Sequence, residues 1–294
     1  MINTSKIIDT HIHFVQAEHF EVRAQAAGHL PTAEHLLEVF RKYNIVKGIA
    51  MGTYNSLDEN GAVSYPRTIN LGGEFSLEQY NQPKEILYCA GIDSSTLTKQ
   101  NLRASLELFE KHLRSPHCVG LKLYPGYHDF YVSDPLYDEF YALAAEHNLP
   151  VVIHTGDTAR SSGLLKYSHP LTVDDAAVKF PQTKFVIAHI GNPWIVDAVA
   201  VAKNNPNVYI DMSGLAEGVF EPDWFFDEFR GYCEHLRTWL QYLSHYDKLM
   251  YGSDWPLVNI PTYLEIIGRI VPTQHHEQVF YENALQIFGE KLRA

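Results

Sequence analysis

Short apolar runs alternate along the chain with longer segments of helical periodicity. Eight runs dense in Val, Ile, Leu and Tyr are predicted to be strands: residues 6–14, 46–54, 86–93, 118–127, 150–156, 184–191, 207–214 and 248–256. Near-continuous hydrophobicity of this kind is typical of parallel strands that are buried on both faces. The pattern therefore predicts a parallel sheet covered by helices.

Helical patterns fill most of the gaps between these strands. In residues 98–114, apolar residues recur at intervals of four, three and four positions and define one helix face: Leu102, Leu106, Phe109 and Leu113. Further helices are predicted over 32–44, 134–148 and 227–247. Thr32 and Asp134 are the expected N-caps of the first two, because a side-chain oxygen there can accept a hydrogen bond from a free backbone N–H.

Eight strand–helix repeats in 294 residues predict an α/β fold, a (β/α)8 TIM barrel that forms a single domain over residues 1–294. A doubly wound open sheet is the alternative, but the first predicted strand is not followed by the glycine-rich turn that binds phosphate in that fold. Residues 55–84, rich in Gly, Asn and Tyr, are expected to form an insertion on the substrate side of the second strand.

Composition narrows the expected partners. A net charge of −12 at pH 7 disfavours binding to nucleic acid or to an anionic membrane surface. No uncharged apolar run approaches the roughly 20 residues that a transmembrane helix needs. Three widely spaced cysteines, and N-terminal residues without a signal-peptide core, favour a reducing cytoplasm. We therefore expect a cytoplasmic protein that binds a small molecule, with a homodimer as the commonest assembly for such a protein.

Histidine and acidic residues stand at the C-terminal ends of several predicted strands, where TIM barrels carry their active sites. His11 and His13 end the first strand and point to the same face, because side chains alternate along a strand. His154, His189 and Asp254 end the fifth, sixth and eighth strands. The imidazoles of His11, His13 and His154 and the carboxylate of Asp254 suit Zn²⁺ or a similar divalent ion.

Each of these residues alone has an ordinary structural explanation. With 16 histidines in 294 residues, about one His-x-His pair is expected by chance. A single histidine such as His189 is more often a hydrogen-bonded core or rim residue, and Asp254 alone could cap the last helix. Their shared position at the same end of four strands outweighs these explanations.

Four motifs carry a resemblance to a known family: "DTHIHF" at 9–14, "VVIHTG" at 151–156, "FVIAHIGN" at 185–192 and "YGSDWP" at 251–256. Together with "YENALQIFG" near the end of the chain, they resemble the amidohydrolase superfamily. The most similar branch is amidohydrolase 2, which contains metal-dependent TIM-barrel hydrolases and decarboxylases of the aminocarboxymuconate-semialdehyde type. The resemblance runs from His11 to about Gly289.

The resemblance implies a role for each residue at the strand ends. His11, His13 and His154 would bind the metal, and Asp254 would bind it and take a proton from the activated water. His189 would stand beside the water or the substrate carbonyl as an electrophile or as a general acid or base. One divalent ion is expected, zinc first, with manganese and iron also accepted by this ligand set.

Lys122 in the fourth predicted strand has three interpretations. In some members of the superfamily a lysine in this strand is carbamylated and bridges two metals. In members with a single metal, which we favour here, a lysine would contact a substrate carboxylate or carbonyl. The structural alternative is an ion pair with an acid such as Asp9, because a buried lysine requires a partner.

The predicted activity is hydrolysis of a small carbonyl substrate (an amide, a lactone or another ester) by water activated at the metal. A metal-dependent, non-oxidative decarboxylase of a small carboxylated ring or enol is the alternative, and Arg160 or Arg67 would then hold a carboxylate. The third hypothesis is a barrel that binds a metal or a ligand without catalysis. Residues at or near the strand ends are candidates for substrate binding: Lys122, Tyr124, Arg160 and Trp255, with Tyr54 and Tyr127 beside them.

Overall fold

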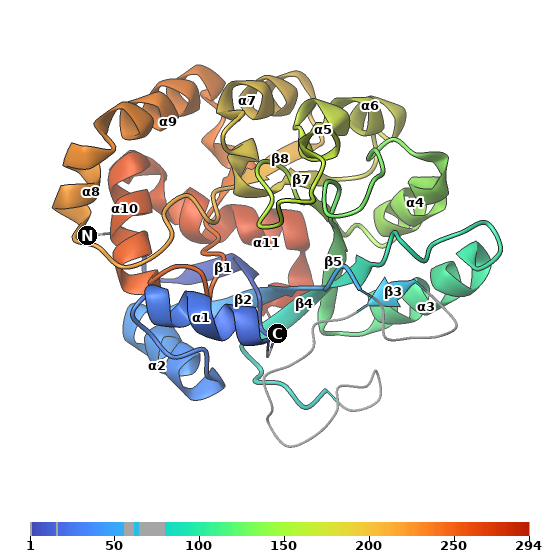
Figure 1. Ribbon diagram of the computed structural model, residues 1–294, viewed down its shortest axis with the longest axis horizontal. Coiled ribbons are helices and arrows are strands. Elements are labelled where there is room, and N and C mark those ends of the chain that lie inside the picture. The colour runs from blue at the N-terminus through green and yellow to red at the C-terminus, as the bar shows by residue number, and fades with distance from the viewer. Residues whose placement is uncertain (1, 16, 56–61, 65–79, 294) are drawn as a thin grey trace.

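A computed structural model describes residues 2–15, 17–55, 62–64 and 80–293 (Figure 1). Eight strands run parallel in the order β1-β2-β4-β5-β6-β7-β8-β9. Their bounds are β1 Ile7–Ile12, β2 Ile45–Met51, β4 Ile86–Ile92, β5 Cys118–Leu123, β6 Val151–Ile153, β7 Phe185–Ile187, β8 Val208–Asp211 and β9 Leu249–Met250. Each strand lies inside one of the segments predicted from the hydrophobic pattern, apart from the first residue of β2.

Backbone hydrogen bonds between β1 and the segment after β9 bring the two ends of the sheet together. The N–H of Thr10 donates to the carbonyl of Tyr251 at 3.0 Å, and the N–H of Asp254 donates to the carbonyl of His11 at 2.7 Å. Together with interleaved helices, these bonds make a nearly closed (β/α)8 barrel, so the predicted fold class is confirmed. Most of the expected insertion at 55–84 lies outside the described residues, but β3 (Val63–Ser64) pairs antiparallel with β4.

The helices follow the strands around the barrel (Figure 1). Their bounds are α1 Glu18–Ala26, α2 Ala33–Tyr43, α3 Leu102–Arg114, α4 Asp138–Glu146, α5 Leu165–Ser168, α6 Leu171–Lys179, α7 Ile195–Asn204, α8 Pro222–Glu228, α9 Arg230–Leu243, α10 Ile260–Ile270 and α11 Asn283–Phe288. Thr32 caps α2 as predicted, with its side chain accepting a hydrogen bond from the N–H of His35 at 3.2 Å. Asp134 accepts from the N–H of Leu136 at 2.9 Å and begins the turn that leads into α4.

One predicted helix is divided in the structure. Residues 227–247 read as a single long helix, but α8 ends at Glu228 and α9 begins at Arg230. The backbone of Phe229, at φ −102° and ψ 32°, departs from helical geometry and separates the two. Ser244 has a φ of 56° and ends α9 in the left-handed conformation that commonly stops helices.

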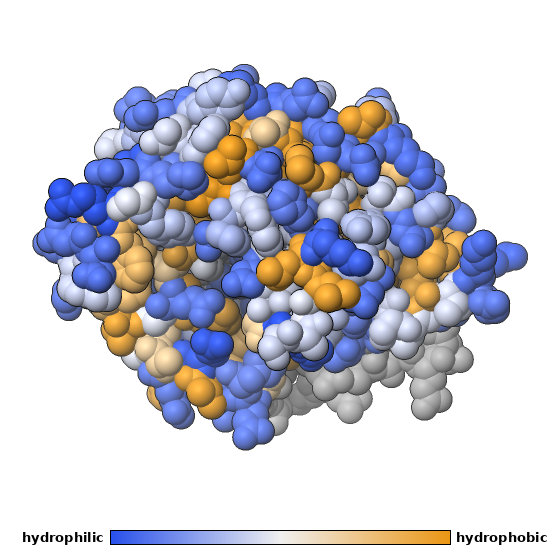
Figure 2. Space-filling view, turned by 45° about the horizontal axis from the view of Figure 1, so that its top comes forward, coloured by the Kyte–Doolittle hydropathy of each residue, from blue (hydrophilic) through white to orange (hydrophobic). Residues whose placement is uncertain are grey.

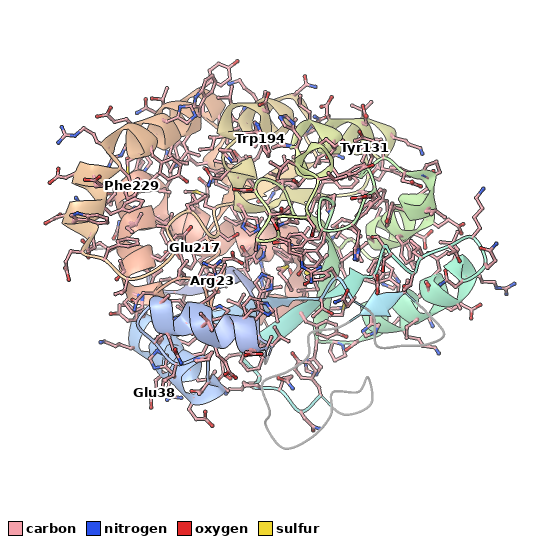
Figure 3. The ribbon with its side chains drawn as sticks, in the orientation of Figure 1. Arg23, Glu38, Tyr131, Trp194, Glu217 and Phe229 are labelled. Carbon is pink, nitrogen blue, oxygen red and sulfur yellow. The ribbon has the colours of Figure 1, made fainter. Side chains whose placement is uncertain are left out.

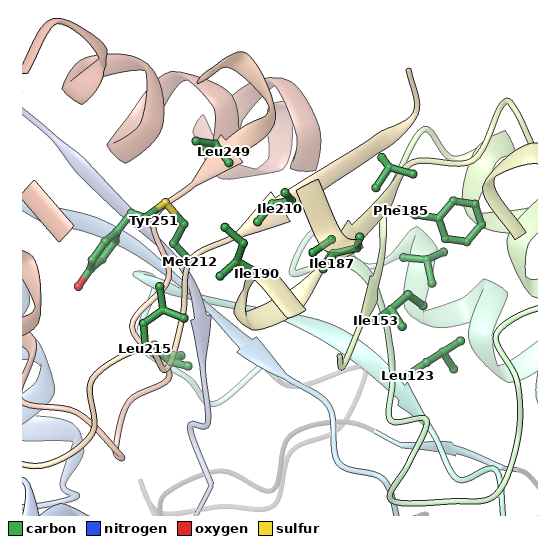
Figure 4. Close-up of a cluster of buried hydrophobic side chains, with 14 of the residues drawn as sticks. Leu123, Ile153, Phe185, Ile187, Ile190, Ile210, Met212, Leu215, Leu249 and Tyr251 are labelled. Atoms are coloured by element: carbon green, nitrogen blue, oxygen red, sulfur yellow. The ribbon is translucent and has the colours of Figure 1, made fainter. Parts of the chain in front are cut away.

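The hydrophobic core has two parts. The larger one packs strand residues against the surrounding helices, as Figure 4 shows for Leu123, Ile153, Phe185, Ile187 and Ile210. The smaller one joins other strand residues to α11. Lys184, just before β7, donates to the carbonyl of Ile287 in α11 at 3.2 Å. This helix therefore covers the end of the barrel at which the strands begin, and leaves the opposite end available for a site.

The face of the molecule in Figure 2 is mostly hydrophilic, with apolar side chains in small separate groups. Scattered exposed apolar residues are ordinary for a globular surface. Among the described residues, no helix is both long enough and apolar enough to cross a bilayer.

Candidate metal centre

His11 and His13 leave β1 toward the same space, as the alternation of side chains requires. His11 is buried, whereas His13 lies at the rim with 17% of its side chain exposed. Nε2 of His13 lies 3.1 Å from Oδ1 of Asp254, and Nε2 of His11 lies 3.6 Å from the same oxygen. The first strand and the end of the last strand thus converge on one carboxylate oxygen.

His189 and Asp254 reach this space through unusual backbone conformations. The φ angle is 59° at His189 and 71° at Asp254, a left-handed region that residues other than glycine seldom adopt. One ligand atom from each of His11, His189 and Asp254 lies within 4.8 Å of the other two. Strained backbone of this kind persists where the surrounding structure holds it, and it concentrates at functional sites.

Asp211, the last residue of β8, contacts the imidazole of His11 on the side away from Asp254. Its Oδ2 lies 3.0 Å from Nδ1 of His11, and both side chains are buried. Its Oδ1 accepts hydrogen bonds from the backbone N–H groups of His189 and Ser213, each at 3.1 Å. Since the carboxylate accepts the proton on Nδ1 of His11, Nε2 of that ring is left with its lone pair toward the cavity.

Burial and neighbouring charges set the ionisation of the cluster. Burial is the main cause that lowers the pKa of His11, to about 4, so the ring is neutral at pH 7. Burial would raise the pKa of Asp254, but His189, His13 and His11 outweigh it and hold that pKa well below its usual range. The pKa of Asp211 is likewise low, because His11 and His189 outweigh its burial. The site thus combines neutral imidazoles with an ionised carboxylate.

His154 lines the same cavity but stands outside the compact group. The centre of its ring lies 5.1 Å from that of His189, and its Nε2 lies 3.1 Å from the backbone carbonyl of Asp157. A carbonyl can only accept, so this contact assigns the proton to Nε2 and leaves the lone pair on Nδ1. The structure therefore brings together three members of the expected ligand set, His11, His13 and Asp254, with His189 nearer to them than His154.

Lys122 is fully buried in β5, and its Nζ has no hydrogen-bond partner among the described residues. Burial lowers its pKa to about 8, although Asp211 and Asp254 act in the opposite direction. The structure does not show the alternative of an ion pair with Asp9, whose Oδ1 instead accepts from the N–H of Ser253 at 2.8 Å. The ammonium group lies 5.0 Å from the centre of the Tyr124 ring, on the wall of the cavity.

A cavity of about 700 Å³ opens above these side chains. Tyr124 and Tyr127 form one wall, where Tyr54 stacks on Tyr127 with ring centres 5.3 Å apart. Arg160 donates a hydrogen bond to the hydroxyl of Tyr54, and its guanidinium lies 4.5 Å from the centre of that ring. The substrate-binding candidates Lys122, Tyr124 and Arg160 are therefore all at the cavity.

Trp255 does not line this cavity. Its side chain is buried and packs against Phe14, with ring centres 6.3 Å apart, and against His29 at 5.9 Å. The other arginine that we considered for a carboxylate, Arg67, lies outside the described residues.

A family model described as Amidohydrolase matches residues 92–289, about two thirds of the chain. The chain belongs to the amidohydrolase family. The expected resemblance is thus confirmed, and with it membership in a family of metal-dependent hydrolases and decarboxylases. No curated protein matches the sequence of this amidohydrolase.

Solved structures share the fold along the whole chain. An uncharacterized TIM-barrel protein from Bordetella bronchiseptica is 17% identical with a TM-score of 0.66, covering 98% of this chain and 100% of that chain. A probable 2-pyrone-4,6-dicarboxylic acid hydrolase from Acinetobacter baumannii is 15% identical with a TM-score of 0.61 (97% and 100% covered). A 2,6-dihydroxybenzoate decarboxylase from Rhizobium is 14% identical with a TM-score of 0.62 (99% and 100% covered).

The donor set of this amidohydrolase fits a divalent metal ion. Nε2 of His11 and Oδ1 of Asp254 are buried and have no hydrogen-bond partner among the described residues. Buried polar atoms normally have a hydrogen-bond partner. Two lone-pair atoms without one, close to a further imidazole, form a set of ligands that a bound cation would satisfy. Neutral imidazole and carboxylate are ligands that zinc, manganese and iron accept.

Several residues at the site were not assigned from the sequence. Asp211 and Ser213 lie near the end of the predicted strand 207–214, but nothing in the sequence gave either residue a partner. Arg23 belongs to α1, for which no helical pattern was recognised. It pairs with Glu217 at 3.6 Å on the rim of the cavity, where Figure 3 shows the two side chains beside each other.

Proposed function

We propose that this amidohydrolase is a metal-dependent hydrolase of a small carbonyl substrate, an amide, a lactone or another ester. The observation that carries the proposal is the convergence of His11, His189 and Asp254 within 4.8 Å at the base of a cavity, where Nε2 of His11 and Oδ1 of Asp254 have no hydrogen-bond partner among the described residues. Buried polar atoms without a hydrogen-bond partner are uncommon, and here two of them lie within one group of potential metal ligands.

His11, His13 and Asp254 would hold the ion, and His154 and His189 are the two candidates for a fourth ligand. His154 was the expected ligand, but His189 lies in the compact group with His11 and Asp254. Zinc is the first expectation, with manganese and iron as alternatives. A divalent ion bound there would polarise the substrate carbonyl and favour the deprotonation of water near neutral pH.

The side chains supply the proton transfers of hydrolysis. Because its pKa is low, Asp254 is ionised at neutral pH and can receive a proton from the attacking water. As a weak base it holds that proton only briefly and passes it to the leaving nitrogen or oxygen as the bond to the carbonyl carbon breaks. Lys122, cationic at pH 7 and buried on the cavity wall, would contact the substrate carbonyl or a carboxylate beside it.

A non-oxidative decarboxylase is the second candidate function, and the position of Arg160 at the cavity favours it. Its guanidinium stacks on Tyr54 at the cavity and can hold a carboxylate through two parallel hydrogen bonds. In this reaction the bond to the carboxylate carbon breaks, CO₂ leaves, and the ring or enol carbon keeps the electron pair and takes a proton. The neighbours of similar fold include a decarboxylase and a hydrolase, and both act on carboxylated rings by name.

Metal content and substrate profile test the proposal together. Purified wild-type protein is analysed for metals and assayed with a panel of lactones, amides and carboxylated aromatic rings. We expect close to one divalent ion per chain and chelator-sensitive turnover of at least one class. Loss of carboxylate without water incorporation into the product would select the decarboxylase. Bound metal with no turnover of any class would instead favour a barrel that binds without catalysis, and the absence of metal would overturn the proposal.

Two variants decide the fourth ligand. His154→Ala and His189→Ala each remove one imidazole from the cavity, and His235→Ala removes an exposed imidazole on α9 as the matched control. The variant that lacks the true ligand should lose most of its metal, whereas the control should keep the wild-type content. If both cavity variants retain full metal, neither histidine is a ligand.

A further inference from the structure

The hydroxyl of Ser213 lies at the centre of the polar network behind the metal centre. Its Oγ is 2.9 Å from Nδ1 of His189 and 3.2 Å from Nδ1 of His11. It also forms a hydrogen bond with Oδ1 of Asp211. Ser213 is fully buried, so no bulk water competes for these contacts. One side chain thus joins the two imidazoles to one carboxylate.

Counting protons assigns a direction to each of these bonds. Oδ1 of Asp211 already accepts hydrogen bonds from the backbone N–H groups of His189 and Ser213, and the single hydroxyl proton of Ser213 is donated to the same oxygen. The Oγ lone pairs then face Nδ1 of His189, which must donate. The backbone carbonyl of Ser213, 3.3 Å from the same nitrogen, is a second acceptor. An unprotonated Nδ1 would face two oxygen lone pairs without a proton between them.

We propose that Ser213 is a positioning residue that fixes His189 as its Nδ1–H tautomer, so that Nε2 presents a lone pair to the cavity. In this tautomer the neutral ring is an acceptor or a metal ligand at Nε2, and it is not a hydrogen-bond donor to a substrate carbonyl. This restricts the broader set of roles expected for His189. The use of this lone pair, as a metal ligand or as a proton acceptor, rests on the proposed function. The tautomer itself does not, because it can be observed in the metal-free protein.

The packing around Ser213 explains why the arrangement is stiff. Gly214 has a φ of 66°, and a Cβ there would lie 2.9 Å from Oδ2 of Asp254 and 3.3 Å from Nδ1 of His189. Gly252 is equally confined, because its Cβ would lie 3.2 Å from that of Ser213. The glycines let the backbone approach the imidazole closely enough for both oxygens of Ser213 to reach Nδ1.

Nuclear magnetic resonance of histidine side chains tests the tautomer directly. Protein labelled with ¹⁵N-histidine is stripped of metal and examined at pH 8 by long-range ¹H–¹⁵N correlation, with His189→Gln used to assign the resonance. We expect the proton on Nδ1 and a pyridine-like Nε2. A proton on Nε2 in the wild type overturns the proposal, even if the protein binds metal. The expected tautomer in a protein that binds no metal would leave the proposal standing while the proposed function fails.

Variants of the hydroxyl provide the second readout. Ser213→Ala removes the acceptor, and Ser213→Cys replaces it with a group of similar shape that accepts hydrogen bonds only weakly. In both we expect a mixture of His189 tautomers and zinc affinity weaker by about 10-fold or more in a chelator competition. Ser105→Ala, which removes a buried hydroxyl remote from the cavity, is the control and should leave both readouts unchanged. Wild-type tautomer and affinity in both Ser213 variants would overturn the proposal.

Discussion

The base and the rim of the cavity are built differently. At the base, His11, Asp211 and Ser213 are buried and joined to one another by hydrogen bonds that leave little freedom. At the rim, Arg23 and Glu217 are about half exposed and meet at 3.6 Å, the geometry of a weak surface pair. The base of the cavity can therefore hold its charged side chains in one fixed arrangement, whereas the rim is suited to contacts that vary with the substrate.

The largest effect is expected from Asp254→Asn at the base. The amide keeps the shape of the side chain but removes the charge that faces three imidazoles and the group that receives the proton. We expect turnover to fall by about 10²- to 10⁴-fold, as general base catalysis is lost. Steady-state kinetics on the best substrate of the panel measures this. A variant within about 3-fold of the wild type would remove Asp254 from the chemistry.

Lys122→Met tests how much the buried ammonium group of Lys122, at the base of the cavity, destabilises the fold. Because burial lowers the pKa of Lys122 from 10.5 in the unfolded chain to about 8, the folded protein binds fewer protons than the unfolded chain between these values. The lysine therefore destabilises the fold fully below pH 8, and this penalty fades as the pH rises toward 10.5.

We expect Lys122→Met to be more stable than the wild type at pH 7, by up to about 3 kcal/mol, with a smaller difference near pH 10. Urea denaturation of metal-free protein at the two pH values measures the free energy of unfolding. The same difference at both would mean that the lysine titrates normally in the folded protein.

Arg160→Gln tests whether the rim selects carboxylates. The glutamine keeps a polar side chain near Tyr54 but loses the cation. For a carboxylated substrate we expect KM to rise by about 10-fold with little change in kcat, since a uniform binding contact is lost. A neutral lactone or amide should show unchanged kinetics and serves as the internal control. Equal losses for both substrate classes would show that Arg160 supports the structure of the loop instead.

The smallest effect is expected from Arg23→Gln. Its pair with Glu217 is half exposed, so its loss should change the free energy of unfolding by about 0.5 kcal/mol or less. Urea denaturation of the variant at low and at high salt measures the contribution, and the pair should matter less in high salt. A loss of several kcal/mol would show that the rim is as rigidly built as the base.

The barrel was predictable because buried parallel strands read as apolar runs, and the structure contains a strand in each of the eight predicted segments. Helix α1 was not predicted because only Ala24 of its nine residues is buried, so the sequence shows no apolar stripe. The division at Phe229 also escaped notice, since one residue outside helical geometry leaves the hydrophobic periodicity almost intact.

The strand-end rule brought His11, His13, His154 and His189 to one cavity with Asp254, which the structure shows. It could not predict which ring nitrogen faces the cavity, because that depends on partners distant in the sequence, such as Asp211 for His11. Trp255 was expected at the cavity, but its ring instead packs against Phe14 and His29.

We propose above all that one cation joins the end of β1 to the segment after β9. Anomalous X-ray diffraction at the zinc absorption edge, from crystals grown with zinc, tests it most directly. We expect a single strong peak within bonding distance of Nε2 of His11, Nε2 of His13 and a carboxylate oxygen of Asp254. Full-strength peaks found only elsewhere on the protein, with the three side chains turned away from one another, would contradict it.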